Sequence, residues 1–303
     1  MAITYPTIRG ERKRRTRYQN GWALAFLAPW LVGFLAFTAG PMLMSLYLAF
    51  TDYDLLSAPK WIGAGNFSRM FGSDPLFLQS LKVTAIYVFV GTPLSLTFAL
   101  AVAVVLNRGL RGLDFYRSAI YLPSLFGGSV AIAVLWRKVF NGDGLVNQML
   151  ALVGIHGPSW ISEPHTALGT LIALEVWQFG APMVIFIAGL KQIPAELYEA
   201  ASLDGAKPWR QFSSITFPLI SAFFTINVVL SLKGFLQVFD PVVALTNGGP
   251  GTSTESVTLL IFRGGFTGGE FAYQTANAVV FFIVITIVSL FQFRVLQRRE
   301  ADF

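Results

Sequence analysis

Acidic and very small side chains occur together in one polar stretch of the chain, ELYEAASLDGAKPWRQFSSITFPLI, which lies between two strongly apolar runs. Ala201 and Gly205 are four positions apart and share one helix face. With Ala200 they form a shallow patch that another polypeptide can approach closely. The carboxylates beside this patch are those of Glu196, Glu199 and Asp204. The pattern favours docking to a protein over resting on lipid, because helices that lie on lipid are rich in Lys and Arg.

The same stretch predicts its own local structure. Pro194 suits the start of a helix, because its missing N–H costs nothing in a first turn, and Ala195–Leu203 are mostly good helix formers. Gly205 suits the left-handed residue that closes a helix. A second helix then begins at Pro208 and enters the next apolar run near Pro218, so we expect a helix-turn-helix.

A second candidate for chemistry is Glu175, which lies deep inside the apolar run around LEVWQFGAP. An ionisable group in a spanning helix costs at least about 2.5 kcal/mol and marks a functional site by default. Gln178 and Phe179 follow three and four positions later, on the same face. An acceptor, an amide and an aromatic ring on one face predict a sugar-binding surface. Two interpretations stay open: the face lines a cavity, or Glu175 and Gln178 pair with a partner subunit.

A third group of polar residues ends the fifth apolar run, in SLKGFLQVFDP. Lys233, Gln237 and Asp240 follow one another at intervals of three or four, on successive helical turns. They line the outer part of a cavity, or Lys233 and Asp240 lie at the outer membrane interface; the sequence does not decide between these.

The elements that hold these residues are long apolar runs. The chain has 303 residues, of which 54% are hydrophobic and 13% charged, whereas soluble domains carry roughly 25% charged residues. Runs of about 20 residues match a hydrocarbon core of about 30 Å, and they are continuous, which indicates helices. The six candidate spans are residues 22–50, with a break at Gly40-Pro41, 83–106, 118–136, 168–190, 215–232 and 275–295. We therefore expect an all-α, polytopic membrane protein.

Loop charges predict its orientation, because cytoplasmic loops of membrane proteins carry an excess of Lys and Arg. Basic residues outnumber acidic ones before the first span, in the second loop and in the tail. Those before the first span are Arg9, Arg12, Lys13, Arg14, Arg15 and Arg17. We expect a basic cytoplasmic arm (residues 1–21), a single transmembrane domain (22–296) whose loop 194–218 faces the cytoplasm, and a cytoplasmic tail (297–303).

Several classes of function find no support in the sequence. The absence of cysteine excludes disulfides and thiolate metal sites, and the two histidines match no metalloprotease spacing. The basic arm is explained by membrane orientation, and no nucleic-acid module accompanies it. The pattern G-x-x-x-x-G-K-[ST] does not occur. We expect no catalytic residues, no metal and no ATP site in this chain.

A longer pattern in the polar stretch resembles a known family. The pattern resembles the EAA loop of ABC importer membrane subunits. It consists of Glu199-Ala200-Ala201, then Gly205 after three further residues, then Ile215-x-Phe-Pro218 after nine more, with phenylalanine where leucine is usual. Three other stretches, LAPWLVGFLAFTAGPML, NGDGLVNQML…PSWISEP and VFDPVVALTNGGPGTST, resemble binding-protein-dependent sugar permeases of the maltose-type, larger-partner class. The resemblance covers about residues 22–296.

The resemblance implies a transport subunit of the bacterial inner membrane. The EAA loop is then a coupling helix in a groove of a separate cytoplasmic ATPase dimer, which binds ATP and Mg. A second homologous permease, an extracytoplasmic solute-binding protein, a sugar and membrane lipid are the other expected partners. In this loop Glu199 contacts the ATPase, Ala200 and Ala201 permit close packing and Gly205 makes the turn. The expected coupling residues are Glu199, Ala200, Ala201, Asp204, Gly205, Ile215 and Pro218.

The resemblance also places a transport cavity along spans three to five. The matching positions are Ser124 and Gly128, Glu175 and Phe179, and Ser231 and Phe235. With Gln178, Gln237 and Asp240 they form the expected substrate path. The alternative function is a stand-alone secondary transporter, which needs a coupling-ion site and usually an inverted repeat; neither is evident in the sequence. The sequence does not name the sugar; related permeases also carry glycerol phosphate esters, but Glu175 would repel a phosphate, which favours a neutral ligand.

Overall fold

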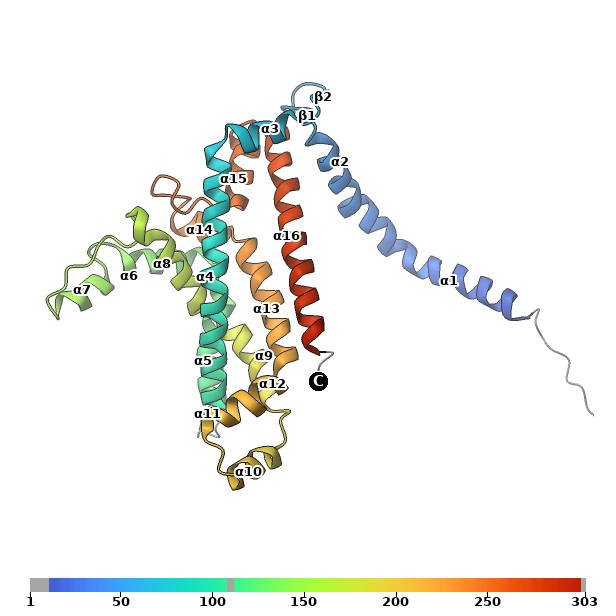
Figure 1. Ribbon diagram of the computed structural model, residues 1–303. Helices are drawn as coiled ribbons and strands as arrows, with labels where there is room; N and C mark the ends of the chain where they lie inside the picture. The colour runs from blue at the N-terminus through green and yellow to red at the C-terminus, as the bar shows by residue number, and fades with distance from the viewer. Residues whose placement is uncertain (1–10, 108–111, 301–303) are drawn as a thin grey trace, which may run out of the picture.

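The computed structural model describes residues 11–107 and 112–300, and these ranges are almost entirely helical (Figure 1). The helices are α1 (Glu11–Phe34), α2 (Gly40–Leu48), α3 (Gly65–Gly72), α4 (Pro75–Leu106), α5 (Leu113–Phe126), α6 (Val130–Phe140), α7 (Leu145–Ala151), α8 (Pro164–Trp177), α9 (Gly180–Leu190), α10 (Ala195–Leu203), α11 (Pro208–Gln211), α12 (Phe217–Leu219), α13 (Ser221–Leu236), α14 (Asp240–Leu245), α15 (Val257–Phe262) and α16 (Phe271–Glu300). Three π-helical turns, Leu35–Ala39, Phe212–Thr216 and Arg263–Thr267, join neighbouring helices. The expected all-α fold is confirmed. Parts of the predicted arm and tail, residues 1–10 and 301–303, lie outside the described residues.

The helix α4 is the central rod of a bundle. Its 32 residues span about 48 Å at 1.5 Å per residue, more than the roughly 30 Å of a hydrocarbon core. Asp74 caps its first turn by accepting a hydrogen bond of 2.8 Å from the backbone N–H of Leu76. The helices α8, α9 and α13 pack along α4. We call the two ends of this bundle the α3 end and the α10 end, after the helix that lies at each (Figure 1).

Two clusters of buried apolar side chains hold the bundle together. One contains Phe77, Tyr87 and Tyr273 and joins α4 to α8, α13 and α16. The other contains Leu96 and Phe186 and joins α4 to α9 and the start of α13. The α3 end is covered by a two-stranded antiparallel sheet, in which β1 (Thr51–Asp52) pairs with β2 (Lys60–Trp61). Strands of two residues are too short to show an alternating pattern, so the sequence did not predict them.

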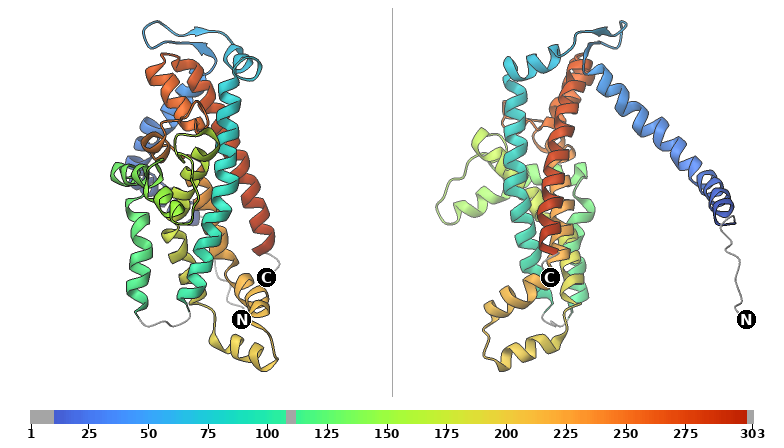
Figure 2. Two further views of the ribbon diagram at one scale, coloured as in Figure 1. Left: turned by 90° about the vertical axis from the view of Figure 1, so that its left-hand side faces the viewer. Right: turned by 45° about the vertical axis from the view of Figure 1, so that its right-hand side comes forward.

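The first span leaves the bundle. The helix α1 extends away from the other helices in Figure 1 and in the right-hand view of Figure 2, while α2 packs against α16. Only 6% of this apolar span, Ala25–Leu48, is buried. The predicted break at Gly40-Pro41 is wrong, because the chain stays helical there. The π-helical turn Leu35–Ala39 precedes Gly40, whose N–H donates to the carbonyl of Leu35, and Pro41 follows in a first turn, where no intrahelical donor is lost.

Three of the predicted spans are broken. Phe115–Phe126 and Val130–Ala151 meet at 101°, Pro164–Trp177 and Gly180–Leu190 at 42°, and Pro208–Leu219 and Ser221–Leu236 at 69°. The sequence shows each as one apolar run, because hydropathy registers the length of a run and not its bends; Pro182 signals a kink in the fourth run alone. Only three helices, Ala25–Leu48, Pro75–Leu106 and Phe271–Arg294, span the required length unbroken within the described residues; with each bent pair counted as one span, there are up to six.

Candidate functional site

The helix α10 protrudes from one end of the molecule (Figure 1). Its bounds, Ala195–Leu203, match the prediction, and Pro194 is its N-cap. Gly205 follows with a φ of +75°, the left-handed region that glycine enters without a steric penalty. The N–H of Ala206 then donates to the carbonyl of Ala201 at 2.8 Å, which satisfies an orphan carbonyl of the last turn. The predicted helix-turn-helix is therefore present.

Side-chain hydrogen bonds brace α10 against the segment that returns to the bundle. The hydroxyl of Tyr198 lies 2.9 Å from Oγ1 of Thr216. From α11, Nε2 of Gln211 donates to Oγ of Ser202 at 2.9 Å and to the carbonyl of Ala206 at 3.2 Å. These bonds cross from one arm of the loop to the other. The loop is therefore a braced unit and not a free excursion of the chain.

The outer surface of this loop is fully available to another molecule. No residue of α10 is buried, and the carboxylate-bearing Glu199 and Asp204 are exposed beside Ala200 and Gly205. Large apolar side chains are exposed there too: Leu203 is 90% and Trp209 76% accessible. The sequence prediction missed both, although an apolar residue on a polar loop is a signal for a contact surface.

The remaining residues of the predicted motif lie inside the loop's hinge. Ile215 is half-buried in the π-helical turn Phe212–Thr216, and Pro218 is half-buried in α12. Ile220, which follows directly, is fully buried in the core cluster near the α10 end. The 69° bend between Pro208–Leu219 and Ser221–Leu236 occurs at this point. These side chains therefore set the angle between the loop and α13.

The breaks in two spans bring the predicted path residues together. Gly127 ends α5 directly over Gln178, since a Cβ on Gly127 would lie 1.4 Å from Oε1 of that amide. A Cβ on Gly128 would lie 4.0 Å from Oδ2 of Asp240, at the start of α14. Ser129 then caps α6 by accepting a hydrogen bond of 3.3 Å from the N–H of Ile132. Gln178 is half-buried there, whereas Gly128 and Asp240 are exposed. These three predicted residues lie around the point where α5 turns into α6, and we call this group the interior cluster.

On the other side of the interior cluster, the start of α9 lies close to the backbone of α5. Gly180 begins α9 so near α5 that a Cβ there would lie 2.8 Å from the carbonyl oxygen of Ile120 and 3.1 Å from Oγ of Ser124. That hydroxyl of Ser124 donates back to the carbonyl of Tyr121 at 2.6 Å. Phe179, just before α9, has its ring centroid 6.3 Å from that of Phe98 on α4. Ser124 therefore borders the interior cluster, whereas Phe179 packs toward α4.

Other predicted path residues lie apart from this cluster. Phe235 is buried, with its ring centroid 5.3 Å from that of Tyr87. Glu175 also lies near the Tyr87 hydroxyl, and that hydroxyl has no hydrogen-bond partner among the described residues. Ser231 is half-buried in α13, and Gln237 is exposed directly after α13. The structure thus places Glu175 and Phe235 around Tyr87, apart from the interior cluster. Phe179, Ser231 and Gln237 belong to neither group.

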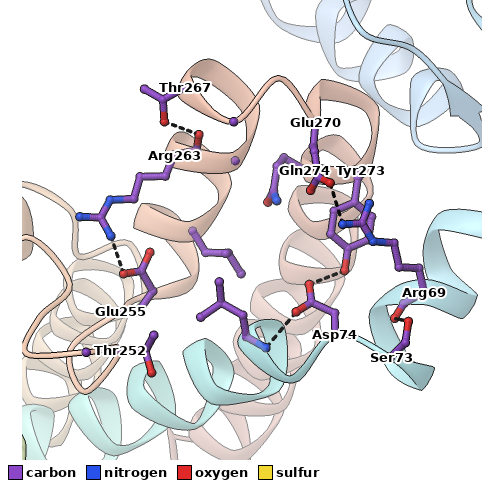
Figure 3. Close-up of a pocket in the computed structure, with 15 residues that line it drawn as sticks. Arg69, Ser73, Asp74, Thr252, Glu255, Arg263, Thr267, Glu270, Tyr273 and Gln274 are labelled. Atoms are coloured by element: carbon purple, nitrogen blue, oxygen red, sulfur yellow. Dashed lines mark hydrogen bonds and ion pairs between the residues drawn. The ribbon is translucent and has the colours of Figure 1, made fainter.

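A polar groove at the α3 end was not predicted (Figure 3). Arg69 of α3 pairs with Glu270 at 2.7 Å, and its guanidinium lies 4.0 Å from the ring centroid of Tyr273. Arg263 pairs with Glu255 at 2.9 Å. Burial raises the pKa of the Glu255 carboxyl, and the Arg263 guanidinium opposes that rise. Because Arg69 and Glu270 are 201 positions apart, no local sequence pattern signals this contact.

Comparisons with known proteins identify the chain. A family model described as "Binding-protein-dependent transport system inner membrane component" matches residues 83–301. The chain belongs to this family. The probable ABC transporter permease protein YesP of Bacillus subtilis is 43% identical to this permease, over 94% of this chain and 93% of YesP. The probable starch degradation products transport system permease protein AmyD of Thermoanaerobacterium thermosulfurigenes is 32% identical over 96% of this chain and 99% of AmyD.

A solved structure has the same architecture as the permease. A bacterial ABC transporter involved in the import of the acidic polysaccharide alginate contains a chain that superposes with a TM-score of 0.79. The two chains are 25% identical, and the match covers 95% of this permease and 99% of that chain. The family resemblance drawn from the EAA-like loop is therefore confirmed, and it favours an ABC permease over a stand-alone secondary transporter.

The roles of individual residues in the permease are not assigned by these comparisons. The coupling residues and path residues named from the sequence stay predictions. The described residues contain no group of three or more His, Asp or Glu side chains that could hold a metal ion. What the arrangement offers is therefore binding and movement: an exposed braced loop at one end and broken helices that bring polar groups into the bundle.

Proposed function

We propose that the permease is one of two membrane subunits of an ATP-driven carbohydrate importer, and that α10 couples it to a separate ATPase. The observation that carries this proposal is the braced and protruding α10, none of whose residues is buried. A rigid element is required because a hinge motion is transmitted only by parts that do not bend. The names of relatives support carbohydrate as the cargo, AmyD being one. The imported sugar itself is not specified.

In this mechanism the partner ATPase binds ATP and Mg. Its closure pulls α10, and the hinge around Pro218 transfers that pull to α13. Glu199 offers an acceptor to the ATPase, while Ala200, Ala201 and Gly205 carry no side chain larger than a methyl group and so permit close packing. Asp204 adds a second carboxylate at the turn. Domain closure of this kind moves the two membrane subunits between inward-open and outward-open states.

The α10 end then faces the cytoplasm, and the α3 end faces the solute-binding protein outside. The C-terminal end of α16 lies on the same side as α10 (Figure 1), which agrees with the predicted cytoplasmic tail. The charge bias of the N-terminal arm puts that terminus inside as well. This orientation corresponds to a multi-pass protein of the bacterial inner membrane.

The permease supplies half of the translocation path, and the interior cluster is the best-supported stretch of it. Gln178 and Asp240 provide hydrogen-bonding groups, and Ser124 borders them. Sugar hydroxyls need such partners, since a polar group left unpaired in a dry site costs free energy. Glu175 keeps the two uses that the sequence left open: it lines the path, or together with Gln178 it pairs with the partner subunit.

The exposed first span supports a second membrane subunit. Phe26 of α1 is 81% and Phe37 of the π-helical turn Leu35–Ala39 is 84% accessible, so the rest of the described chain leaves these two apolar side chains largely uncovered. In a bilayer, lipid or another subunit covers them. A homologous permease that packs along α1 would complete the path, with lipid covering the remainder.

Co-purification tests the proposal. A tagged permease expressed with an untagged ATPase should retain that ATPase, and Glu199→Lys should reduce the retained amount at least tenfold, because a misplaced charge at an interface costs several kcal/mol. Asp143→Lys makes the same change of charge in the exposed segment between α6 and α7 and should retain the ATPase fully. Loss in both variants, or in neither, contradicts α10 as the coupling element, and transport without any ATPase supports the secondary transporter.

A further inference from the structure

A second cavity lies beside α6, apart from the interior cluster. It has a volume of about 480 Å³ and is formed by three segments that are distant in sequence. The lining residues are Arg137, Lys138, Asn141, Ile161, Ser162, Leu245, Thr246, Gly249 and Pro250. Small-molecule sites generally have volumes of about 300–1,000 Å³, so the cavity is large enough for a sugar unit and much larger than one acidic side chain.

The charge of this cavity is entirely positive. Arg137 and Lys138 both line it, and no carboxylate does. Within the described residues neither forms an ion pair with a carboxylate. Two acidic residues adjoin the lining segments in sequence without lining the cavity: Asp143, and Glu163, whose Oε1 accepts a hydrogen bond of 3.2 Å from the N–H of Ser159. Both cations also lie in the last turn of α6, where they stabilise the helix dipole, but this does not explain why they share a cavity.

The guanidinium of Arg137 is held in place. Its Nε donates to the carbonyl of Leu245 at 2.9 Å, and its terminal amino groups donate no hydrogen bond within the described part of the chain. A guanidinium offers parallel N–H groups that match the oxygens of a carboxylate or phosphate. Arg137 is thus fixed on one side and free to bind an anion on the other.

The opposite wall is rigid as well. The hydroxyl of Thr254 donates to the carbonyl of Gly249 at 2.7 Å, and its Oγ1 lies 2.8 Å from Oγ1 of Thr246. The N–H of Gly249 donates to the carbonyl of Thr246 at 3.0 Å, and Arg263 donates to the carbonyl of Asn247. A wall fixed by its own hydrogen bonds does not have to be ordered when a ligand binds, which lowers the cost of binding.

The remaining lining groups suit a hydroxylated framework. Asn141, Ser162 and Thr246 offer an amide and two hydroxyl groups, while Ile161 and Pro250 offer apolar surface. Sites for small molecules combine apolar walls with a few placed polar groups in this manner. An inorganic anion alone would leave most of the volume and these groups unused.

The cavity is connected to the interior cluster through α6 and α14. These helices pack together, with Gly128 and Asp240 near their first residues and Arg137 and Leu245 near their last. Arg137 lies seven positions after Val130, the first residue of α6, which is about 10 Å along the helix. Glu175 does not line the cavity, so its carboxylate does not oppose an anion held there.

We propose that this cavity binds an anionic saccharide unit, with its carboxylate or phosphate on Arg137 and Lys138. The proposal rests on the function proposed above and narrows its substrate class: the cargo carries an oxyanion on a hydroxylated carbon framework. Arg137 and Lys138 hold the oxyanion, and Asn141, Ser162 and Thr246 hold hydroxyl groups.

Equilibrium binding to the purified, ATPase-containing transporter tests this. The probes are labelled digalacturonate for the carboxylate, sn-glycerol 3-phosphate for the phosphate, and maltose as the neutral comparison. At least one anionic probe should bind more tightly than maltose to the unchanged protein. Lys138→Gln should weaken that probe about tenfold, since hydrogen bonds to charged groups are the stronger ones, and should leave maltose unchanged. Arg137→Gln should act in the same direction, but it also removes the bond to Leu245.

Lys60→Gln is the matched control, because Lys60 is an exposed lysine of β2 outside the cavity; it should bind every probe as the unchanged protein does. Which anion responds to Lys138→Gln tells a carboxylate from a phosphate. The proposal is overturned if neither anion binds more tightly than maltose, or if Lys138→Gln affects neither anion or all three probes alike. Retained ATPase in each preparation separates this failure from failure of the proposed function, which would appear as loss of the ATPase itself.

Discussion

At the residue scale, the absence of a side chain is what lets the broken spans fit together. Gly127 leaves room for the amide of Gln178, and Gly180 leaves room for the backbone of α5. The two cases differ in what would have to move. A flexible amide can rotate away from a new methyl group, but the carbonyl oxygen of Ile120 belongs to a helix backbone. Gly180 is therefore the less replaceable of the two.

We predict that Gly180→Ala destabilises the protein by about 1–3 kcal/mol, the usual cost of forcing extra volume into a packed interior. Gly169→Ala in α8 is the matched control, because a Cβ there would contact nothing within 4 Å, and alanine is favoured over glycine in a helix by about 0.5–1 kcal/mol. Thermal unfolding of the two purified variants in one detergent measures the difference. Equal shifts in Tm would show that the α5–α9 approach does not depend on this glycine.

At the element scale, predictability depends on how local the cause of a structure is. The helix α10 and the left-handed Gly205 follow from helix propensity and from glycine's lack of a Cβ, so the sequence alone predicted them. The 101° bend after Phe126 is stabilised by Gln178, which comes from another span. The groove at the α3 end needs Arg69 beside Glu270, again a contact between distant segments. Such features depend on tertiary packing and carry no periodic signal.

In the candidate site, too, the features with a local cause are the ones that the sequence predicted. The loop residues from Glu199 to Gly205 sit where the pattern placed them, on an exposed helix and its turn. Phe235 does not, because its position on α13 faces the Tyr87 side of the bundle. Spacing within one helix indicates which side chains share a face, but not which neighbouring helix covers that face.

The hydrogen bond between Tyr198 and Thr216 lets α10 and the hinge move together in the proposed mechanism. A double-mutant cycle tests this coupling. We predict that Tyr198→Phe leaves the ATPase bound but lowers the amount of cargo transported per ATP hydrolysed, because the loop then moves without moving the hinge. Thr216→Val should have the same effect, and the double variant should be no worse than either single one. Each hydrogen bond of this kind contributes about 0.5–1.5 kcal/mol.

Transport and ATP hydrolysis measured in parallel on the assembled complex provide the ratio. Tyr116→Phe is the control, since Tyr116 is an exposed tyrosine of α5 whose ring contacts Phe115. Additive losses from Tyr198→Phe and Thr216→Val would mean that the two hydroxyls act separately. In that case the loop is not braced by their contact.

At the scale of the whole molecule, the two ends of the bundle have different tasks in the proposed mechanism, so the orientation in the membrane decides whether the mechanism is possible. Because the chain has no cysteine, a single introduced thiol reports on one end alone. Leu56, in the β1–β2 turn, is 94% exposed, and Leu203, in α10, is 90% exposed. Two leucines of equal accessibility at opposite ends form a matched pair.

We predict that a membrane-impermeant maleimide added to spheroplasts labels Leu56→Cys at once and leaves Leu203→Cys unlabelled until the membrane is permeabilised. The permease is expressed without its ATPase, so that no partner protein shields α10. The reason is the charge bias of the arm and second loop, which retains those segments in the cytoplasm, and the position of α10 on the same side as the end of α16. The reverse pattern of labelling would place α10 outside the cell, where no ATP-driven partner can reach it, and no adjustment of the coupling residues would rescue the mechanism.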